Sequence, residues 1–285
     1  KSKHSVLGNG LGSENSVVKH KGSLYYYATT GIFNVDLNSH QLHSIVELPK
    51  NLWEWGSCLL KDKEDNFWIG THEKLLHLKK KLFSNVIQPQ LKEFDEIYSI
   101  IQLKNGNLLC GANQGMIFKK STSDTAFVLY RKLFAQAPVS DMVSDEKGNI
   151  WCGSAYQGIG IIRNKEDEIF TKEDGLRDNT NLSLLYTNSK ELFACGDNGV
   201  SKIIMNEKGQ ISFKNYSHST GSNNYAVFKA AIQKPDGGLL FGGDFGLYEL
   251  KNDSLKPVLI SQSARNNFFV TDMKIDAAGY AWIST

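Results

Sequence analysis

The feature of this 285-residue sequence that most constrains its fold is a short pattern that recurs seven times. Each copy has a polar turn, an apolar or aromatic run, a small residue, a short polar loop, and then glycine with a second apolar run. In the sixth copy these parts are residues 236–238, residues 239–241, Gly242 and residues 246–248. The small-residue position is held by Tyr27, Gly70, Gly111, Gly153, Cys195, Gly242 and Ser284. Their spacing of 41 to 47 residues defines a repeat of about 42 residues.

The repeat predicts β-strands because its apolar runs are short and are bounded by turn residues. A helical repeat of the same length would instead place apolar residues at i, i+3, i+4 and i+7. Asn105-Gly106, Lys147-Gly148 and Asp236-Gly237 supply the positive φ that tight hairpins require. We therefore predict an all-β β-propeller of seven four-stranded repeats. Residues 1–285 are expected to form this single propeller, and its last blade need not be complete.

The ends of the chain bear on that last blade. The strands of a blade are named A to D from the axis outward, so that strand A precedes the repeat's turn and strand B follows it. Residues 5–11 resemble the outer strand and the Gly-Leu linker that close other copies, so they are expected to supply an outer strand to the last blade. That blade would still lack strand C. We therefore expect the chain to be part of a longer protein; a last blade of three strands is the alternative.

Charge and composition narrow the classes of function. The chain has 32 Lys and Arg residues against 30 Asp and Glu residues, which argues against a nucleic-acid or membrane-surface partner held by bulk charge. The four cysteines form no C-x-x-C pair, and the seven histidines show no metal-ligand spacing. Neither a metal nor a cofactor is predicted, and Cys110 and Cys152 are expected to be buried and unbridged.

Three segments carry a resemblance to a known family. They are residues 148–153 (Gly-Asn-Ile-Trp-Cys-Gly), residues 65–71 (Asp-Asn-Phe-Trp-Ile-Gly-Thr) and residues 171–176 (Thr-Lys-Glu-Asp-Gly-Leu). These runs resemble the two-component regulator propeller repeat, and the resemblance covers essentially the whole chain. Individual copies depart from the family pattern at Lys74, which replaces a glycine, and at Tyr27 and Cys195, which replace the small residue.

The resemblance implies the periplasmic, extracytoplasmic sensor region of a bacterial hybrid two-component system, of the kind that detects polysaccharide breakdown products. It implies further domains in the same polypeptide, including a histidine kinase and a span of the inner membrane, and it allows a homodimer of the full-length receptor. This chain is then expected to bind a ligand and relay the signal, with no catalytic residues of its own and no nucleic-acid partner.

The strand order predicts which face binds the ligand. In an antiparallel blade the B–C loops and the D–A connections lie on one face, and the A–B turns lie on the other. The A–B turns are alike in every copy, whereas the B–C loops and D–A connections differ, as binding surfaces on a rigid scaffold do. Aromatic side chains and amides suit the ring faces and hydroxyls of sugars, so we expect an oligosaccharide there. The candidate ligand-binding residues are Trp53, Trp55, His72, Tyr98, Asn113, Gln114, Tyr156, Gln157, Asn181, Asp197, Asn198, Asn224, Tyr225, Asp244, Phe245 and Arg265.

A structural interpretation of the same residues stays open. Trp53, Trp55 and Tyr98 could pack in the core or the rim, and the Asn and Asp residues could simply form turns. Three other tryptophans share one register in strand B, and for that reason we assign them to packing between blades. They are Trp68, Trp151 and Trp282.

Two other functions also stay open. A propeller polysaccharide lyase or glycoside hydrolase would need acid and base groups that converge on one face near the axis. The candidates for those groups are Glu73, Asp95, Asp197 and Asp244. A protein-interaction platform is the third function, and a large exposed apolar patch would favour it.

Overall fold

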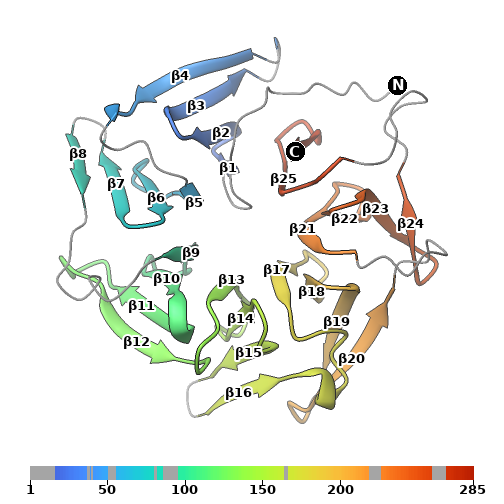
Figure 1. Cartoon of the computed structure of the whole chain (residues 1–285). Coiled ribbons are helices and arrows are strands. Elements are labelled where there is room, and N and C mark those ends of the chain that lie inside the picture. Colours follow the sequence, from blue (N-terminus) through green and yellow to red (C-terminus); the bar gives the residue numbers. More distant parts are fainter. Residues whose placement is uncertain are drawn as a thin grey trace.

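The computed structural model describes residues 17–36, 39, 41–50, 56–79, 82–85, 96–163, 166–217, 226–258 and 268–285. These residues form an all-β β-propeller, as predicted, with antiparallel sheets arranged around a central axis (Figure 1). Neighbouring strands within each sheet are also neighbours in sequence, so every blade is a simple meander.

The bounds of the strands follow the repeat. Blade 1 is β1 (Val17–His20), β2 (Ser23–Ala28), β3 (Gly31–Asp36) and β4 (Gln41–Glu47). Blade 2 is β5 (Gly56–Lys61), β6 (Phe67–Thr71), β7 (Leu75–Lys79) and β8 (Leu82–Asn85). Blade 3 is β9 (Ile97–Gln102), β10 (Leu108–Ala112), β11 (Met116–Lys120) and β12 (Val128–Lys132), with the short 3-10 helix η3 (Asn113–Gly115) as its B–C loop.

Blade 4 is β13 (Val139–Ser144), β14 (Ile150–Ser154), β15 (Ile159–Ile162) and β16 (Asp167–Phe170), and the 3-10 helix η4 (Lys172–Asp174) follows it. Blade 5 is β17 (Asn181–Tyr186), β18 (Leu192–Gly196), β19 (Gly199–Met205) and β20 (Ile211–Tyr216). Blade 6 is β21 (Phe228–Gln233), β22 (Leu239–Gly243), β23 (Gly246–Lys251) and β24 (Ser254–Pro257). The seventh repeat forms β25 (Asp272–Ile275) and β26 (Ala281–Ser284).

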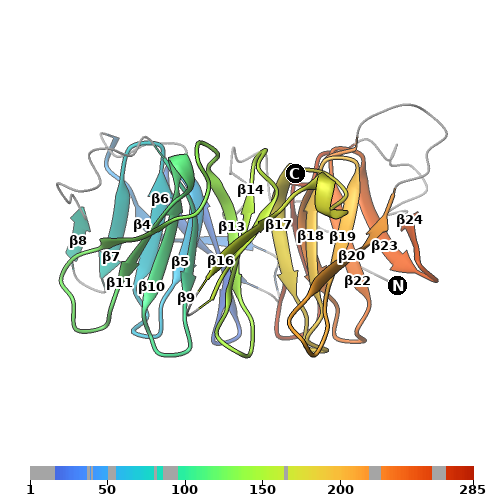
Figure 2. The same ribbon diagram turned by 90° about the horizontal axis from the view of Figure 1, so that it is seen from below.

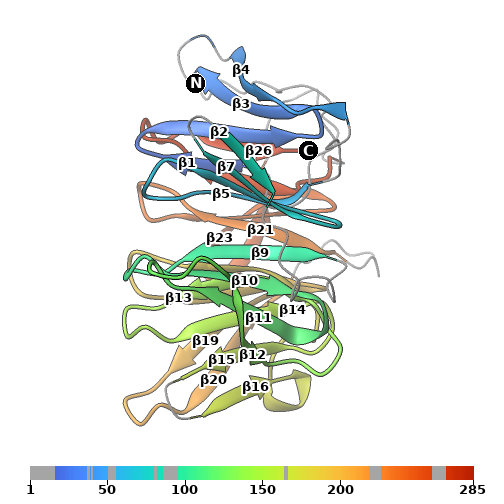
Figure 3. The ribbon, with the colours of Figure 1, turned by 90° about the vertical axis from the view of Figure 1, so that its left-hand side faces the viewer.

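The expectation of seven blades is corrected to six, because only six four-stranded sheets form among the described residues. The seventh repeat contributes a two-stranded sheet that contains only strands A and B. This sheet still fills a place in the ring, since β25 contacts both β21 and β1, and β26 lies beside blade 1 in Figure 3. Each of the seven small residues marks one A–B hairpin. A hairpin forms only the two inner strands, so seven hairpins do not require seven complete blades. Residues 5–11, the expected outer strand, lie outside the described residues.

Small residues end strand B because the next blade packs directly against that position. A Cβ atom on Gly111 would lie 2.7 Å from Val139 Cγ1 in β13. A Cβ atom on Gly153 would lie 2.7 Å from the carbonyl oxygen of Asn181 in β17. Both distances are far below ordinary carbon contacts, so neighbouring blades approach each other closely at these two positions.

Buried tryptophans join strand B to the A–B turn. Trp151 is 2% exposed, and its indole N–H donates to Asp145 Oδ2 at 3.2 Å. The other carboxylate oxygen of Asp145 accepts two backbone N–H groups of its own turn at 2.9 Å each. The same pair recurs at 2.7 Å as Trp68 with Asp62 and as Trp282 with Asp276. The assignment of these tryptophans to packing is confirmed, and their aspartate partners were not anticipated.

Carboxylates also join the inner strands of adjacent blades. Asp141 in β13 accepts the backbone N–H of Leu184 in β17 at 2.7 Å, and Asp272 in β25 accepts that of Val17 in β1 at 3.4 Å. Each inner strand has an unpaired backbone edge towards the axis, and these carboxylates satisfy donors on it. Burial raises the pKa of both carboxyl groups to about 6, while the Lys274 ammonium opposes the shift.

The cysteines belong to the core. All four are buried and free, which confirms the prediction for Cys110 and Cys152. Burial raises the pKa of the Cys58 thiol to about 12, so this group stays protonated and unreactive at neutral pH.

Candidate functional site

Figure 2 shows the propeller from the side, with its loops gathered on two faces. On one of them, the B–C face, the B–C loops meet the D–A connections. The backbone N–H of Gly158 in the B–C loop of blade 4 donates to the carbonyl of Asn179, just before β17, at 2.8 Å. The N–H of Asn198 in the B–C loop of blade 5 donates to the carbonyl of Ala226, just before β21, at 2.8 Å. The predicted convergence of these loops on one face is confirmed.

An open pocket of about 550 Å³ lies on the B–C face between blades 3 and 4. Its floor is apolar, with the side chains of Leu133 and Phe134 buried beneath it. Its volume falls in the range of small-molecule sites, roughly 300–1,000 Å³. The lining residues are Lys132, Leu133, Phe134, Ala135, Tyr156, Gln157, Ile169, Thr171 and Asn179.

One wall of the pocket is the six-residue connection between β12 and β13, residues 133–138. The backbone N–H of Leu133 donates to the carbonyl of Gly115 in η3 at 2.8 Å, which anchors the connection on blade 3. Gly115 has φ +70°, and a Cβ there would collide with the backbone of Phe134. Glycine at this loop position therefore lets the connection pack tightly against blade 3.

The opposite wall is the B–C loop of blade 4, which is tied to the same connection. Gln157 Oε1 accepts the backbone N–H groups of Gln136 at 3.1 Å and Ala137 at 3.0 Å. The Tyr156 hydroxyl donates to the carbonyl of Gln136 at 3.0 Å. Tyr156 is nevertheless 55% exposed, so its ring forms a fixed aromatic surface that is open to solvent. Such a surface is suited to stacking against a flat apolar ring face.

The D–A connection of blade 4 closes the pocket on its third side. Thr171 caps η4 in a capping box, in which its hydroxyl accepts the Glu173 N–H and Asp174 accepts the Thr171 N–H. Asn179 Oδ1 accepts the backbone N–H of Lys172 at 2.8 Å. The pocket rim is therefore held in place by hydrogen bonds within the protein before any ligand arrives.

A second polar group lies on the same face at blades 5 and 6. Asn198 Nδ2 donates to Asp178 Oδ2 at 3.1 Å, and Lys229 Nζ lies 3.2 Å from Asp244 Oδ1. Burial raises the pKa of Asp197, and the nearby carboxylates of Asp178 and Asp244 raise it further. This group thus contains a carboxyl that keeps its proton to a higher pH than an ordinary aspartate.

The structure therefore brings some of the predicted residues together. Tyr156 and Gln157 line the pocket, and Asp197, Asn198 and Asp244 form the second polar group. None of Asp197, Asn198 and Asp244 is among the lining residues of the pocket, so we treat the two sets separately.

Other predicted residues lie apart or serve packing. His72 of blade 2 pairs with Glu96, and Asn113 and Gln114 lie in η3. Tyr98 is the extra residue of a β-bulge in β9, because its neighbours Ile97 and Ser99 pair with Ala112 and Gly111. Asn181 is 3% exposed and donates to the Asp178 carbonyl, and Phe245 packs on the core between blades 5 and 6. The predicted residues that lie outside the described ranges are Trp53, Trp55, Asn224, Tyr225 and Arg265.

The apolar part of the pocket was not predicted from the sequence. Leu133 and Phe134 lie in a connection that has no repeat signature, and Ile169 lies in an outer strand. Of these three residues only Ile169 is unusual for its position, because its apolar side chain is 41% exposed at the outer edge of a blade. An exposed isoleucine alone is too common to identify a site from sequence.

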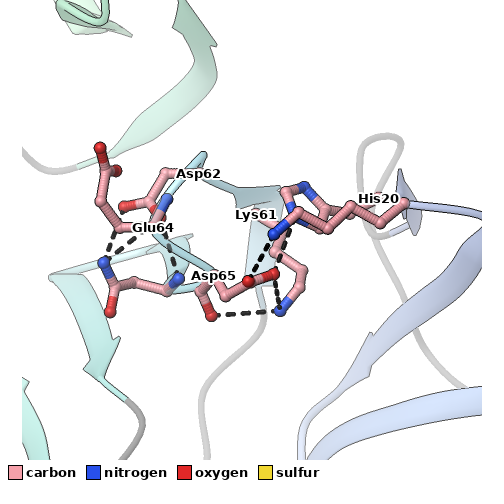
Figure 4. Close-up of polar contacts among 7 residues, drawn as sticks. His20, Lys61, Asp62, Glu64 and Asp65 are labelled. Atoms are coloured by element: carbon pink, nitrogen blue, oxygen red, sulfur yellow. Dashed lines mark hydrogen bonds and ion pairs between the residues drawn. The ribbon is translucent and has the colours of Figure 1, made fainter.

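The opposite face carries the A–B turns, and Figure 4 shows a charged cluster there that joins blades 1 and 2. Asp65 lies 2.6 Å from Lys21 Nζ, 2.8 Å from His20 Nε2 and 3.4 Å from Lys61 Nζ. The hydrogen bond from Lys21 is the main reason that the pKa of Asp65 falls to about 2. Because all these partners belong to the protein itself, we interpret the cluster as a contact between blades.

The described residues contain no group of three or more His, Cys, Asp or Glu side chains placed to hold a metal ion. The helices among those residues are also too short and too polar to cross a bilayer. What they define is a β-propeller with a preorganised open pocket on its B–C face.

Comparison with known proteins places this fold among several propellers. No family model matches the chain, and no curated protein matches it. Virginiamycin B lyase from Staphylococcus aureus is similar in structure, with TM-score 0.73, 15% identity, and coverage of 96% of this chain and 92% of that one. A streptogramin B lyase gives TM-score 0.70 and 17% identity over 98% and 92% of the two chains.

The extracellular domain of a putative hybrid two-component system from B. thetaiotaomicron is also similar, with TM-score 0.52 and 15% identity. That match covers 94% of this chain, but this chain spans only 38% of that domain. At identities this low, the similarities establish the propeller fold alone.

Proposed function

We propose that this chain is the ligand-sensing propeller of a periplasmic receptor of the hybrid two-component class, and that its ligand is an oligosaccharide. The observation that carries the proposal is the pocket between blades 3 and 4. There the exposed ring of Tyr156 stands beside the side-chain amides of Gln157 and Asn179, above an apolar floor.

Two observations support the receptor class. The repeats resemble the two-component regulator propeller pattern, and the extracellular domain of a putative hybrid two-component system shares the fold over 94% of this chain. Since this chain spans 38% of that domain, the relay of a signal is assigned to further parts of the same polypeptide, with a histidine kinase as the output.

The chemistry of the pocket supports a sugar as the ligand. A pyranose ring has apolar C–H faces that stack on aromatic rings and an edge of hydroxyls that hydrogen-bond with amides. Tyr156 supplies the aromatic surface, and Gln157 and Asn179 supply the amides at its side. A fixed pocket loses little conformational entropy when the ligand binds.

The rigidity of the rim also suggests how a signal would arise. The B–C loop of blade 4 is bonded to the connection from blade 3, and Gly158 is bonded to the connection that follows. We therefore expect little change inside the propeller on binding. The ligand would act by favouring one arrangement of the complete receptor over another.

Glycan-array screening followed by calorimetry with the purified chain tests the proposal. Tyr156→Ala should weaken binding of the selected oligosaccharide by about tenfold, because the stacking surface is lost. Tyr280→Ala is the matched control, since Tyr280 is 51% exposed and lies in an A–B turn on the opposite face. Equal effects of the two substitutions, or no binding across a broad set of neutral and charged oligosaccharides, would contradict the proposal.

A lyase is the second candidate function. The two lyase structures match almost the whole chain, and Asp197 has a raised pKa beside Asp178 and Asp244, as a general acid requires. Turnover of streptogramin B antibiotics or of uronate-containing polysaccharides, lost in Asp197→Asn, would favour this function. Stoichiometric binding without turnover would favour the sensor.

A further inference from the structure

The side-chain amide of Gln157 is oriented by the protein itself. Its Oε1 atom accepts the backbone N–H groups of Gln136 at 3.1 Å and Ala137 at 3.0 Å. Only the oxygen of an amide accepts hydrogen bonds, so these two contacts determine which end faces the connection. The Nε2 group, with two N–H donors, has no partner among the described residues, and Gln157 lines the pocket.

Hydrogen bonds within the protein also orient the polar groups on the other side of the pocket. Asn179 Oδ1 accepts the backbone N–H of Lys172, which leaves the Nδ2 donors without a partner among the described residues. The Thr171 hydroxyl is already engaged, because it accepts the Glu173 N–H at 3.3 Å and donates to Asp174 Oδ2 at 3.2 Å. Asn179 thus offers a ligand the two N–H donors of Nδ2, while its Oδ1 is already bonded to the Lys172 N–H.

Lys132 is the one charged side chain that lines the pocket. It forms no ion pair with any residue that the structure describes. The adjacent Arg131 lies 3.2 Å from Asp167, so that carboxylate is already neutralised and does not offset the Lys132 charge. Lys132 therefore adds a positively charged donor to the two amide NH₂ groups.

We propose that this pocket selects a sugar ring that bears an anionic group, either a carboxylate or a sulfate. This inference rests on the proposed function and names the class of its ligand. The side-chain nitrogens of Lys132, Gln157 and Asn179 are all donors, whereas a sugar hydroxyl is both donor and acceptor. An anionic oxygen accepts only, and charge-assisted hydrogen bonds are roughly twice as strong as neutral ones. The apolar floor and the Tyr156 ring would receive the ring face.

Calorimetry with three matched series of probes tests the inference. The series are β-1,4-glucose oligomers, β-1,4-glucuronate oligomers and 6-O-sulfated glucose oligomers, each repeated with the galactose configuration. The uronate or the sulfate should bind at least about fivefold more tightly than the neutral oligomer of equal length. The comparison between these two arms distinguishes a carboxylate ligand from a sulfate ligand.

Two substitutions test the role of the donors with little change in shape. Gln157→Glu keeps the oxygen that accepts from Gln136 and Ala137, and it replaces the NH₂ donors with a carboxylate oxygen. Asn179→Asp likewise keeps the oxygen that accepts the backbone N–H of Lys172, and it replaces the NH₂ donors with a carboxylate oxygen. Each should weaken anion binding by about tenfold or more, because a donor is replaced by a like charge. Lys132→Gln should weaken it by about threefold, as expected for an exposed ion pair.

Gln210→Glu is the matched control, since Gln210 is exposed in the turn between β19 and β20, its Oε1 accepts from Asn206 Nδ2 at 2.8 Å, and it is not among the lining residues of the pocket. It should leave affinity within about twofold of the unsubstituted chain. Preference for the neutral oligomers would overturn this inference and leave the proposed function intact. Absence of binding in every series would overturn both. Anion binding that resists Gln157→Glu would also overturn the inference, because it would place the site elsewhere.

Discussion

Asp141→Asn should change the pH dependence of the stability of the propeller. The Asp141 carboxylate accepts the backbone N–H of Leu184 at 2.7 Å and that of Met142 at 2.8 Å, so it joins the inner strands of blades 4 and 5. An asparagine has one accepting oxygen where the aspartate has two. One of these N–H groups would lose its acceptor, at a cost of about 1–3 kcal/mol.

Burial raises the pKa of Asp141 to about 6, whereas an aspartate in an unfolded chain has a pKa of about 3.9. Between these values the folded chain keeps a proton that the unfolded chain has released. The free energy of unfolding therefore falls as the pH rises from about 4 to about 6, and the contribution is constant above that range. A shift of this size corresponds to about 2–3 kcal/mol.

The variant has no carboxyl group at position 141, so it lacks this dependence. From about pH 8 to about pH 4.5, the original chain should gain about 2 kcal/mol of unfolding free energy relative to Asp141→Asn. Urea unfolding at the two pH values, followed by the fluorescence of the buried tryptophans, measures this difference. Comparing two chains at each pH cancels the contributions of carboxyl groups that do not interact with Asp141; Asp272 is a carboxyl that does interact with it.

Asp124→Asn is the control. Hydrogen bonds from Ser121 lower the pKa of this exposed carboxyl, so the substitution should shift the difference in the opposite direction. A stability difference between the original chain and Asp141→Asn that is the same at both pH values would refute the reasoning. It would mean that the Asp141 carboxylate is as well solvated in the folded chain as in the unfolded one.

Two further substitutions test the packing of the ring. Gly242→Ala should lower the free energy of unfolding by about 1–3 kcal/mol, because a Cβ there would lie 2.8 Å from Val270 Cβ. Val270→Ala in the same chain should restore part of this loss, as measured by urea unfolding. Asp145→Ala should lower the free energy of unfolding more than Trp151→Phe in the same assay, because the aspartate also accepts backbone N–H groups of its turn. Equal losses would show that the hydrogen bonds in the turn contribute little.

The fold could be predicted because each blade repeats the same local chemistry. Residues 239–241 were expected to form strand B, and β22 (Leu239–Gly243) includes them. The number of complete blades could not be predicted in this way. The sequence pattern of the repeat lies in the A–B hairpin, where glycine turns and the packing of adjacent blades require particular residues. Outer strands such as β16 (Asp167–Phe170) alternate exposed and partly exposed side chains, and many different sequences are compatible with such a strand.

The candidate site was predictable only in part, and for a related reason. Tyr156 and Gln157 were expected on the B–C face because they lie in a B–C loop, whose place follows from strand order. The apolar floor could not be found in the same way, because it forms where a connection from blade 3 packs on a strand of blade 4. Leu133 and Ile169 both line the pocket, although 35 residues lie between them in the sequence.

The place of the pocket follows from the lengths of the D–A connections. The connection between β12 (Val128–Lys132) and β13 (Val139–Ser144) has six residues, whereas those between the other blades have eight to fourteen. A short connection runs directly from the outer strand to the inner strand and cannot fold back over the outer part of the next blade. The outer strand of blade 4 therefore stays uncovered at Ile169, which is 41% exposed and lines the pocket together with Tyr156.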